Sequence, residues 1–355
     1  MTTAPDRPLR VGLVGYGHAG NVFHAPLIAA TPGLELAAVV TRDPVRREAL
    51  RARYPGAIAL DGPDDLWARA ADLDLAVVAT PNRSHVALAL AALRAGLPVV
   101  VDKPVAPASA AAREVAAEAR RRGLLWTVFQ NRRWDADFLT LRRLLAEGAL
   151  GAVGRFESRY ERWVPVQKPG WRELGDPEEA GGLLFDLGAH LVDQALQLFG
   201  PVTSVYAELD RRRPGVAVDD DAFVALTHAS GVRSHLWMSK VAAQLGPRFR
   251  VLGDRAAFTK YGMDPQETAL TAGGVPGSPG WGEEPPERWG RLGVDGATRD
   301  VRSEPGRYQE FYALLAAALR SGAPPPVDPE EAIAALEVIE AARRAAQEGR
   351  PVSLR

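Results

Sequence analysis

The stretch LRVGLVGYGHAG, residues 9–20, joins an apolar run of strand length to the pattern G-x-G-x-x-G. Gly15 permits a tight turn after the strand, Gly17 lets the backbone approach a pyrophosphate, and Gly20 lets the following helix pack closely. The N-terminus of that helix would attract the anion. The stretch therefore predicts a dinucleotide-binding strand–helix unit. The expected cofactor contacts in it are Gly15, Gly17, His18, Ala19, Gly20 and Asn21.

Apolar runs alternate with Ala-rich helical stretches through the first part of the chain. A β-α-β rhythm of this kind predicts a doubly wound parallel sheet, so we expect a Rossmann dinucleotide-binding domain over residues 1–130. The expected strands are 9–14, 34–40, 75–79, 98–101 and 124–129, and the expected helices include 86–94 and 110–121.

From about Gly151 the pattern changes to the apolar–polar alternation of half-buried strands. We expect residues 131–355 to form an α+β substrate-binding and oligomerisation domain with a largely antiparallel open sheet, which makes the whole chain α/β. The expected elements are strands at 153–159, 202–209, 222–227 and 232–239, one long helix at 183–199, a loop at 273–290 and two C-terminal helices.

Composition excludes several classes of protein. The chain has 355 residues, of which 46% are hydrophobic and 25% charged, as in an ordinary globular protein. A formal net charge of -1 supplies no field to hold a nucleic acid, and the absence of Cys removes disulfides and thiolate chemistry. No secretory signal or membrane helix is visible, so we expect a cytoplasmic location.

The residues after the second expected strand bear on cofactor choice. The sequence reads Val39-Val40-Thr41-Arg42-Asp43, where an NAD-binding protein normally places an acid on the ribose 2′-OH. Thr41 stands at that position and Arg42 could pair with a 2′-phosphate, which favours NADP. NAD remains possible, because a two-residue shift in register would make Asp43 the acid.

Two further motifs follow later strands, Thr80-Pro81-Asn82-Arg83-Ser84-His85 and Asp102-Lys103-Pro104. Together with the glycine fingerprint they resemble the glucose–fructose oxidoreductase/inositol dehydrogenase (Gfo/Idh/MocA) family, whose usual Glu-Lys-Pro motif has Asp in place of Glu here. Other stretches resemble the branch that contains NADP-dependent scyllo-inositol dehydrogenases. These stretches are residues 15–28, 128–138, 181–200, 247–249 and 260–267.

The resemblance implies three catalytic residues. His190 would accept the hydroxyl proton, Asp186 would orient His190 or bind a neighbouring hydroxyl, and Lys103 would polarise the reacting oxygen. The residues themselves are consistent with this, because Asp186 and His190 stand four apart on one expected helix and a neutral His suits proton transfer near pH 7. The alternatives are a structural Asp–His pair and a solvated lysine.

The other candidates are contacts to cofactor or substrate. His24 either faces the ligands or caps its helix, and His228 and His235 are expected to be structural. The expected cofactor contacts are Thr41, Arg42, Thr80, Pro81, Asn82, His85, Asp102, Lys103 and Gln130. The expected substrate contacts are Lys103, Asn131, Arg132, Trp163, Asp186 and His190, with Trp134, Trp163 and Trp171 either walling a sugar-sized pocket or packing in the core. No histidine pair has metal-ligand spacing with a clear third ligand, so we expect no metal.

The resemblance implies an oxidoreductase that transfers a hydride between NADP(H), or NAD(H), and a CH–OH or ketone carbon of a cyclic polyol or sugar, scyllo-inositol among the candidates. Two other functions remain open on the same fold. One is an NAD-dependent glycosidase that works by transient oxidation, and the other is a non-catalytic sensor of sugars or nucleotides. The resemblance also implies a homodimer or homotetramer, and we expect neither nucleic acid nor membrane as a partner.

Overall fold

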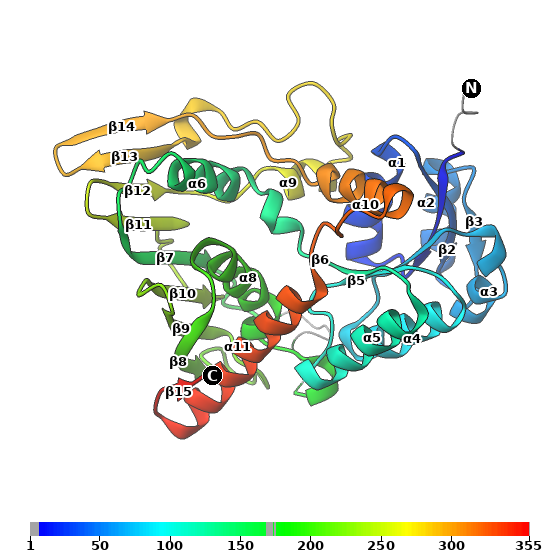
Figure 1. Cartoon of the computed structure of the whole chain (residues 1–355), viewed down its shortest axis with the longest axis horizontal. Helices are drawn as coiled ribbons and strands as arrows, with labels where there is room; N and C mark the ends of the chain where they lie inside the picture. Colours follow the sequence, from blue (N-terminus) through cyan, green and yellow to red (C-terminus); the bar gives the residue numbers. More distant parts are fainter. Residues whose placement is uncertain (1–6, 168–172, 174, 355) are drawn as a thin grey trace.

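The computed structural model describes residues 7–167, 173 and 175–354. They form two sheets with helices packed on them (Figure 1). Trp171, one of the tryptophans predicted to wall the pocket or to pack in the core, lies outside the described residues. No helix among the described residues is long and apolar enough to cross a membrane.

The first sheet has six parallel strands in the order β3-β2-β1-β4-β5-β6. The predicted doubly wound parallel sheet is therefore confirmed, with the short strand β3 added at one edge. Its strands are β1 Leu9–Val14, β2 Leu34–Val40, β3 Ile58–Leu60, β4 Leu75–Val78, β5 Val99–Asp102 and β6 Trp126–Phe129. Its helices are α1 Ala25–Ala30, α2 Pro44–Arg53, α3 Pro63–Trp67, α4 His85–Arg94 and α5 Ser109–Arg122.

The second sheet has nine strands in the order β14-β13-β12-β11-β7-β10-β9-β8-β15. All pairs are antiparallel except β7 with β10, so the predicted open and largely antiparallel sheet is confirmed. The strands are β7 Val153–Glu161, β8 Val202–Asp210, β9 Asp221–His228, β10 Arg233–Ser239, β11 Phe249–Gly253, β12 Ala257–Lys260, β13 Gly290–Val294, β14 Ala297–Val301 and β15 Val352–Ser353.

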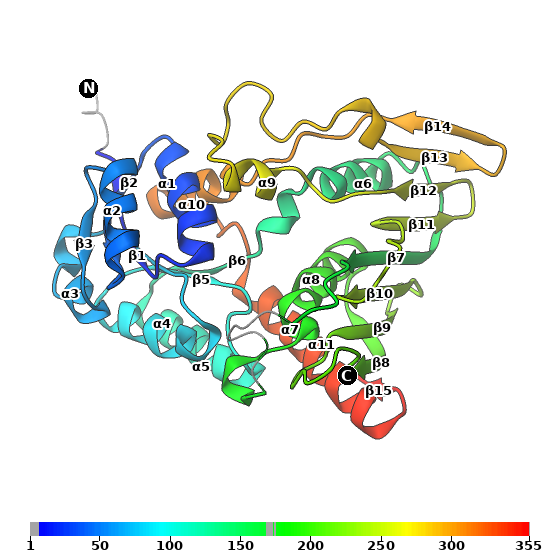
Figure 2. The ribbon, with the colours of Figure 1, turned by 180° about the vertical axis from the view of Figure 1, so that it is seen from behind.

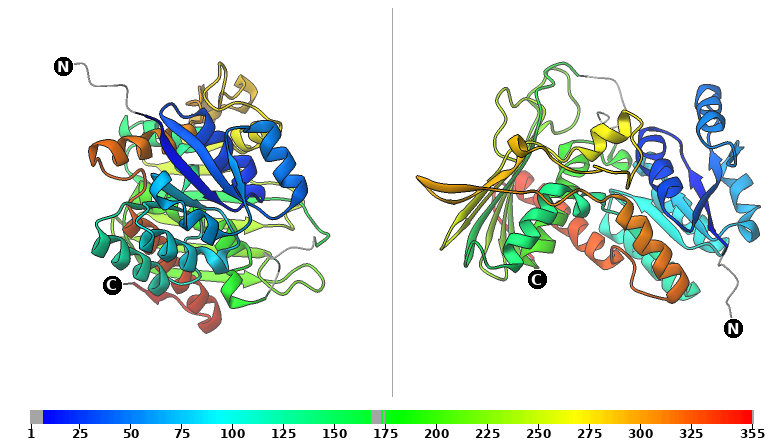
Figure 3. Two further views of the ribbon diagram at one scale, coloured as in Figure 1. Left: turned by 90° about the vertical axis from the view of Figure 1, so that its right-hand side faces the viewer. Right: turned by 90° about the horizontal axis from the view of Figure 1, so that it is seen from above.

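Helices cover one face of this sheet and leave the other open (Figure 3). Burial along β9 alternates at every residue, as expected for a strand with one face on the core. The helices of this part of the chain are α6 Ala136–Ala146, α7 Leu183–Asp186, α8 Gly188–Phe199, α9 Gln266–Thr271, α10 Gln309–Ser321 and α11 Pro329–Glu348.

The predicted helix at 183–199 is wrong in one respect, because it is two helices with a break at Leu187. Leu187 has φ −104° and ψ −36°, and α8 begins at the next residue. The start of α7 is held by Asp219, whose carboxylate accepts the N–H of Leu184 at 2.7 Å. Asp186 and His190 therefore lie on consecutive helices rather than on one.

The chain passes between the sheets through a buried turn at residues 131–134 that directly follows β6. Arg133 in this turn donates to Asp193 of α8 at 2.9 Å and to Glu331 of α11 at 2.5 Å. Later in the chain, α10 returns to pack against α1 of the first sheet (Figure 2). The C-terminal helices thus contact both parts of the molecule.

Candidate active site

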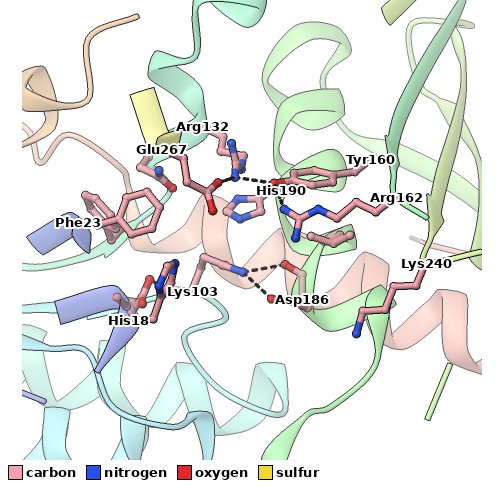
Figure 4. Close-up of a pocket in the computed structure, with 15 residues that line it drawn as sticks. His18, Phe23, Lys103, Arg132, Tyr160, Arg162, Asp186, His190, Lys240 and Glu267 are labelled. Carbon is pink, nitrogen blue, oxygen red and sulfur yellow. Dashed lines mark hydrogen bonds and ion pairs between the residues drawn. The ribbon is translucent and has the colours of Figure 1, made fainter. Parts of the chain in front are cut away.

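A cavity of about 300 Å³ lies between the carboxyl ends of the first sheet's strands and the second sheet (Figure 4). Such a position outside the strand ends is where open α/β sheets bind ligands. Its lining residues come from both parts of the chain. They are His18, Ala19, Phe23, Asp102, Lys103, Phe129, Asn131, Arg132, Tyr160, Arg162, Asp186, Leu187, His190, Lys240 and Glu267.

The glycine loop at one end of this cavity has the geometry that its pattern predicts. Gly15 has φ +100°, and a Cβ there would lie 2.6 Å from the carbonyl oxygen of Ala79. A Cβ on Gly20 would lie 2.0 Å from the carbonyl oxygen of Gly15, so the helix can pack only on a glycine. A Cβ on Gly17 would meet nothing within 4 Å, which leaves room for a pyrophosphate beside the backbone. These residues fit a dinucleotide.

The end of β2 clarifies the role of Asp43. Its carboxylate accepts the N–H groups of Val45 at 2.9 Å and Arg46 at 3.2 Å, so it caps the N-terminus of α2. Thr41 is the first residue after β2 and is buried, whereas the exposed Arg42 donates to the carbonyl of Asp61 at 3.1 Å. The described structure thus uses Asp43 as a helix cap.

Several predicted cofactor contacts are buried and do not line the cavity, His85, Asn82 and Gln130 among them. His85 makes hydrogen bonds with the carbonyls of Pro104 at 2.9 Å and Thr80 at 2.8 Å, and so connects the two loops that follow β4 and β5. Asn82 donates to the carbonyl of Glu179 at 2.9 Å, and Gln130 is 4% exposed. Their contacts with cofactor stay predictions.

Lys103, Asp186 and His190 all line this cavity, and their catalytic roles stay predictions. The Nζ of Lys103 donates to the Asp186 carbonyl at 2.7 Å and to its Oδ1 at 3.2 Å. No hydrogen bond joins Asp186 to His190 among the described residues, so the expected orienting role is not what the geometry shows. Asp186 instead holds the ammonium group of Lys103.

His190 is 4% exposed, and its Nδ1 is buried without a hydrogen-bond partner in the described part of the chain. Burial lowers its pKa well below the ordinary value of 6.5, and the positive charge of Lys103 lowers the pKa further. The imidazole is therefore neutral at pH 7. A neutral imidazole beside an ammonium group can accept a proton from a hydroxyl that the ammonium group binds.

The wall on the side of the second sheet contains residues that sequence reasoning missed. Tyr160 accepts hydrogen bonds from Arg132 at 2.7 Å and Arg162 at 2.9 Å, and Arg132 also donates to Glu267 at 2.7 Å. Tyr160 and Arg162 stand two apart at the end of a strand, a spacing that places both on one face and could have drawn attention to them. Glu267, which lies in α9, ends the stretch 260–267 that is part of the family resemblance, but the sequence assigned it no role.

Trp134, Trp163 and His24 are not among the residues that line the cavity. Trp163 is 56% exposed and is not among the lining residues, and Trp134 is buried against Phe311, as its core alternative predicts. His24 neither lines the cavity nor caps a helix with its side chain, because it is buried with its Nδ1 2.6 Å from the Tyr312 hydroxyl.

His228 bonds to the Gly200 carbonyl and the Ser234 hydroxyl, both at 2.8 Å, which fits the structural role predicted for it. His235 lies beside Phe223 and Trp237 on the open face of the second sheet. In the part of the chain that the structure describes, no group of three or more His, Cys, Asp or Glu side chains is placed to hold a metal ion.

Comparison with known proteins identifies the family. Residues 9–130 match the family description "Oxidoreductase family, NAD-binding Rossmann fold", and residues 142–354 match "Oxidoreductase family, C-terminal alpha/beta domain". These are the two domains of the Gfo/Idh/MocA family, and the chain belongs to it. It is an NAD(P)-dependent oxidoreductase.

Individual relatives match over nearly the whole chain. The uncharacterized oxidoreductase YdgJ of Escherichia coli is 41% identical over 94% of this chain and 94% of its own length. The scyllo-inositol 2-dehydrogenase (NADP(+)) IolW of Bacillus subtilis is 33% identical over 98% of this chain and 96% of its own. The solved structure of yvaA from Bacillus subtilis has a TM-score of 0.94 and 32% identity, covering 99% of this chain and 100% of that one.

The lowered pKa of His190 predicts a pH effect on stability. His190 is neutral in the folded state but takes up a proton in the unfolded state below about pH 6.5. The unfolded state then binds more protons, so this contribution to the free energy of unfolding is lost as the pH falls from about 6.5. Urea unfolding at pH 7.5 and 5.0 should show a smaller loss of stability in His190→Gln than in wild type.

His18→Gln, which removes an exposed imidazole, serves as the control. Equal losses of stability in all three proteins between the two pH values would contradict the prediction.

Proposed function

We propose that the protein transfers a hydride between NADP(H) and a CH–OH or ketone carbon of a cyclic polyol or sugar, with a scyllo-inositol-like ring as one candidate. The observation that carries the proposal is the meeting of the Lys103 ammonium group and the neutral His190 imidazole in a cavity that begins at the glycine loop. The name of the relative IolW supports the substrate class and the cofactor.

The nicotinamide ring would supply the hydride chemistry, and the glycine loop would hold the pyrophosphate. Lys103 binds the oxygen on the reacting carbon and stabilises the negative charge that develops there as the hydroxyl loses its proton. His190 accepts that proton in the oxidation and returns it in the reduction. Asp186 limits the movement of the Lys103 side chain, because its carbonyl and its carboxylate both accept from Nζ.

Cofactor choice follows from the residues after β2. Asp43 caps α2, so its carboxylate is already hydrogen-bonded, and the buried Thr41 offers no negative charge. Arg42 is exposed nearby and could pair with a 2′-phosphate. These features favour NADP over NAD.

Thr41→Asp should move preference toward NAD, because a carboxylate there repels a 2′-phosphate and can bond a 2′-hydroxyl instead. The loss for NADP should be about 1–3 kcal/mol if a charge-assisted contact is disrupted. Fluorescence titration of wild type and variant with NADPH and NADH measures it. Tighter NADH binding by the wild-type protein would overturn the assignment.

Lys103→Met and His190→Gln should each lower turnover by about 10²–10⁴-fold while NADPH binding largely survives, because both act in the chemical step. The assay is absorbance at 340 nm with inositols, hexoses and their keto forms and with both cofactors, beside NADPH fluorescence. Normal turnover in either variant refutes its role. Cleavage of a glycoside with no net change at 340 nm would instead indicate a glycosidase, and ligand binding without any reaction would indicate a sensor.

We also propose a homodimer or homotetramer formed through the open face of the second sheet. On that face the half-buried rings of Phe223 and Trp237 lie 5.1 Å apart, and the Arg159 guanidinium lies 4.0 Å from the Trp237 ring. Light scattering should give a mass of two or four chains for the wild-type protein. The mass should be lower for Trp237→Glu, because a carboxylate on this face would disrupt the contact. A monomeric wild-type protein would refute this proposal.

A further inference from the structure

The second sheet brings two cationic side chains to the cavity on neighbouring strands. The pairing of β7 with β10 ends at Glu161 and Ser239, and the next residue on each strand, Arg162 and Lys240, lines the cavity. The Arg162 N–H donates to the Ser239 carbonyl, and the Val164 N–H donates to the Lys240 carbonyl, each at 2.8 Å. The backbone therefore holds the two positions side by side, facing Lys103 across the cavity (Figure 4).

Arg162 differs from the other cations of this cavity in its partners. Lys103 pairs with Asp186 at 3.2 Å, Arg132 with Glu267 at 2.7 Å, and Lys240 with Glu173 at 2.5 Å. Within the described residues, the guanidinium of Arg162 has no carboxylate partner and donates only to the Tyr160 hydroxyl. Most of its N–H donors remain available to a ligand.

The Tyr160 hydroxyl next to it is also arranged as a donor. Its oxygen accepts one N–H from Arg132 and one from Arg162, at 2.7 and 2.9 Å. These two bonds occupy the lone pairs of the oxygen. The hydroxyl can therefore act toward a bound molecule only as a donor of its proton. Tyr160 and Arg162 together therefore present donors, and no free acceptor, to a bound molecule.

We propose that the substrate carries a negatively charged substituent, a carboxylate or a phosphate, which Arg162 binds with help from the Tyr160 hydroxyl. The inference rests on the proposed function and narrows its substrate class to acidic or phosphorylated polyols and sugars. Lys240 lies at the same end, where its charge is balanced by Glu173, so the anion is assigned to Arg162. The reacting carbon lies at the other end, between Lys103 and His190, so Arg162 acts in recognition and not in the hydride-transfer step.

A neutral polyol is a poorer match for this wall. Its hydroxyls each bring a donor as well as acceptors, and a neutral ring covering Arg162 removes the guanidinium from water without supplying an opposite charge. The lining carboxylates do not repel an anion strongly, because Asp186 and Glu267 are each paired with a cation. Asp102 accepts the backbone N–H of Lys103 at 2.8 Å, and its carboxylate also lies 3.9 Å from the His24 ring.

The test compares matched neutral and acidic ligands: D-glucose with D-glucuronate and D-glucose 6-phosphate, and myo-inositol with an inositol monophosphate. Calorimetry measures binding of each ligand to the NADPH-loaded protein. The rise in absorbance at 340 nm with oxidised NADP measures hydride transfer from each ligand. The wild-type protein should bind the acidic ligand of a pair at least about 10-fold more tightly than the neutral one, as expected for a charge-assisted contact. Comparison of the carboxylate with the phosphate ligands shows which anion the site binds. Arg162→Gln should reduce the preference about 10–100-fold, and Arg94→Gln, at the far end of α4, should not.

The outcomes separate this inference from the proposed function. Equal use of neutral and acidic ligands by wild type overturns the inference and leaves the hydride-transfer function in place. Arg162-dependent binding of an acidic ligand without any hydride transfer supports the charged ligand and counts against the function. Acidic ligands that neither bind better than the neutral ones nor react overturn the inference, as does a preference that survives Arg162→Gln.

Discussion

Buried arginines just after β6 hold the two parts of the molecule together. Arg132 and Arg133 lie in one turn and are each 6% exposed; besides Asp135 next to the turn, their carboxylate partners come from three different helices. A buried guanidinium without a partner would cost several kcal/mol, so these ion pairs favour the approach of α8, α9 and α11 to this turn. Asp193, one of the partners, is three residues after His190 on α8. The same ion pairs therefore bring the imidazole to the end of the first sheet.

This arrangement connects the scaffold with the chemistry. Arg132 stabilises the junction through Glu267, and its charge also contributes to the lowered pKa of His190, after burial and Lys103. A residue that holds elements in place thus also keeps the proton acceptor neutral. On the other side of the cavity, Asp186 keeps Lys103 in position, because its carbonyl and carboxylate both accept from the ammonium group. The cavity consequently contains a neutral base next to a fixed cation.

Much of the fold could be predicted because its signals are local. The glycine fingerprint and the five apolar strands are patterns within a few residues, and both are present in the structure. The strands from 249 to 301 were missed, because their pairing depends on neighbours far along the chain and their alternation is short. The break at Leu187 was missed for a similar reason. The start of α7 is set by Asp219, more than thirty residues away.

The sequence by itself determined the family and the parallel first sheet, and it named Lys103, Asp186 and His190 as candidate catalytic residues. It could do so because motif spacing and apolar periodicity do not depend on distant contacts. Only the tertiary structure decided what these residues do to one another. It showed that Asp186 binds Lys103 instead of His190, and that Arg162 has no carboxylate partner among the described residues. The physical reason is that burial, pKa and ion pairing arise between segments that are adjacent in space but up to a hundred or more residues apart in the chain.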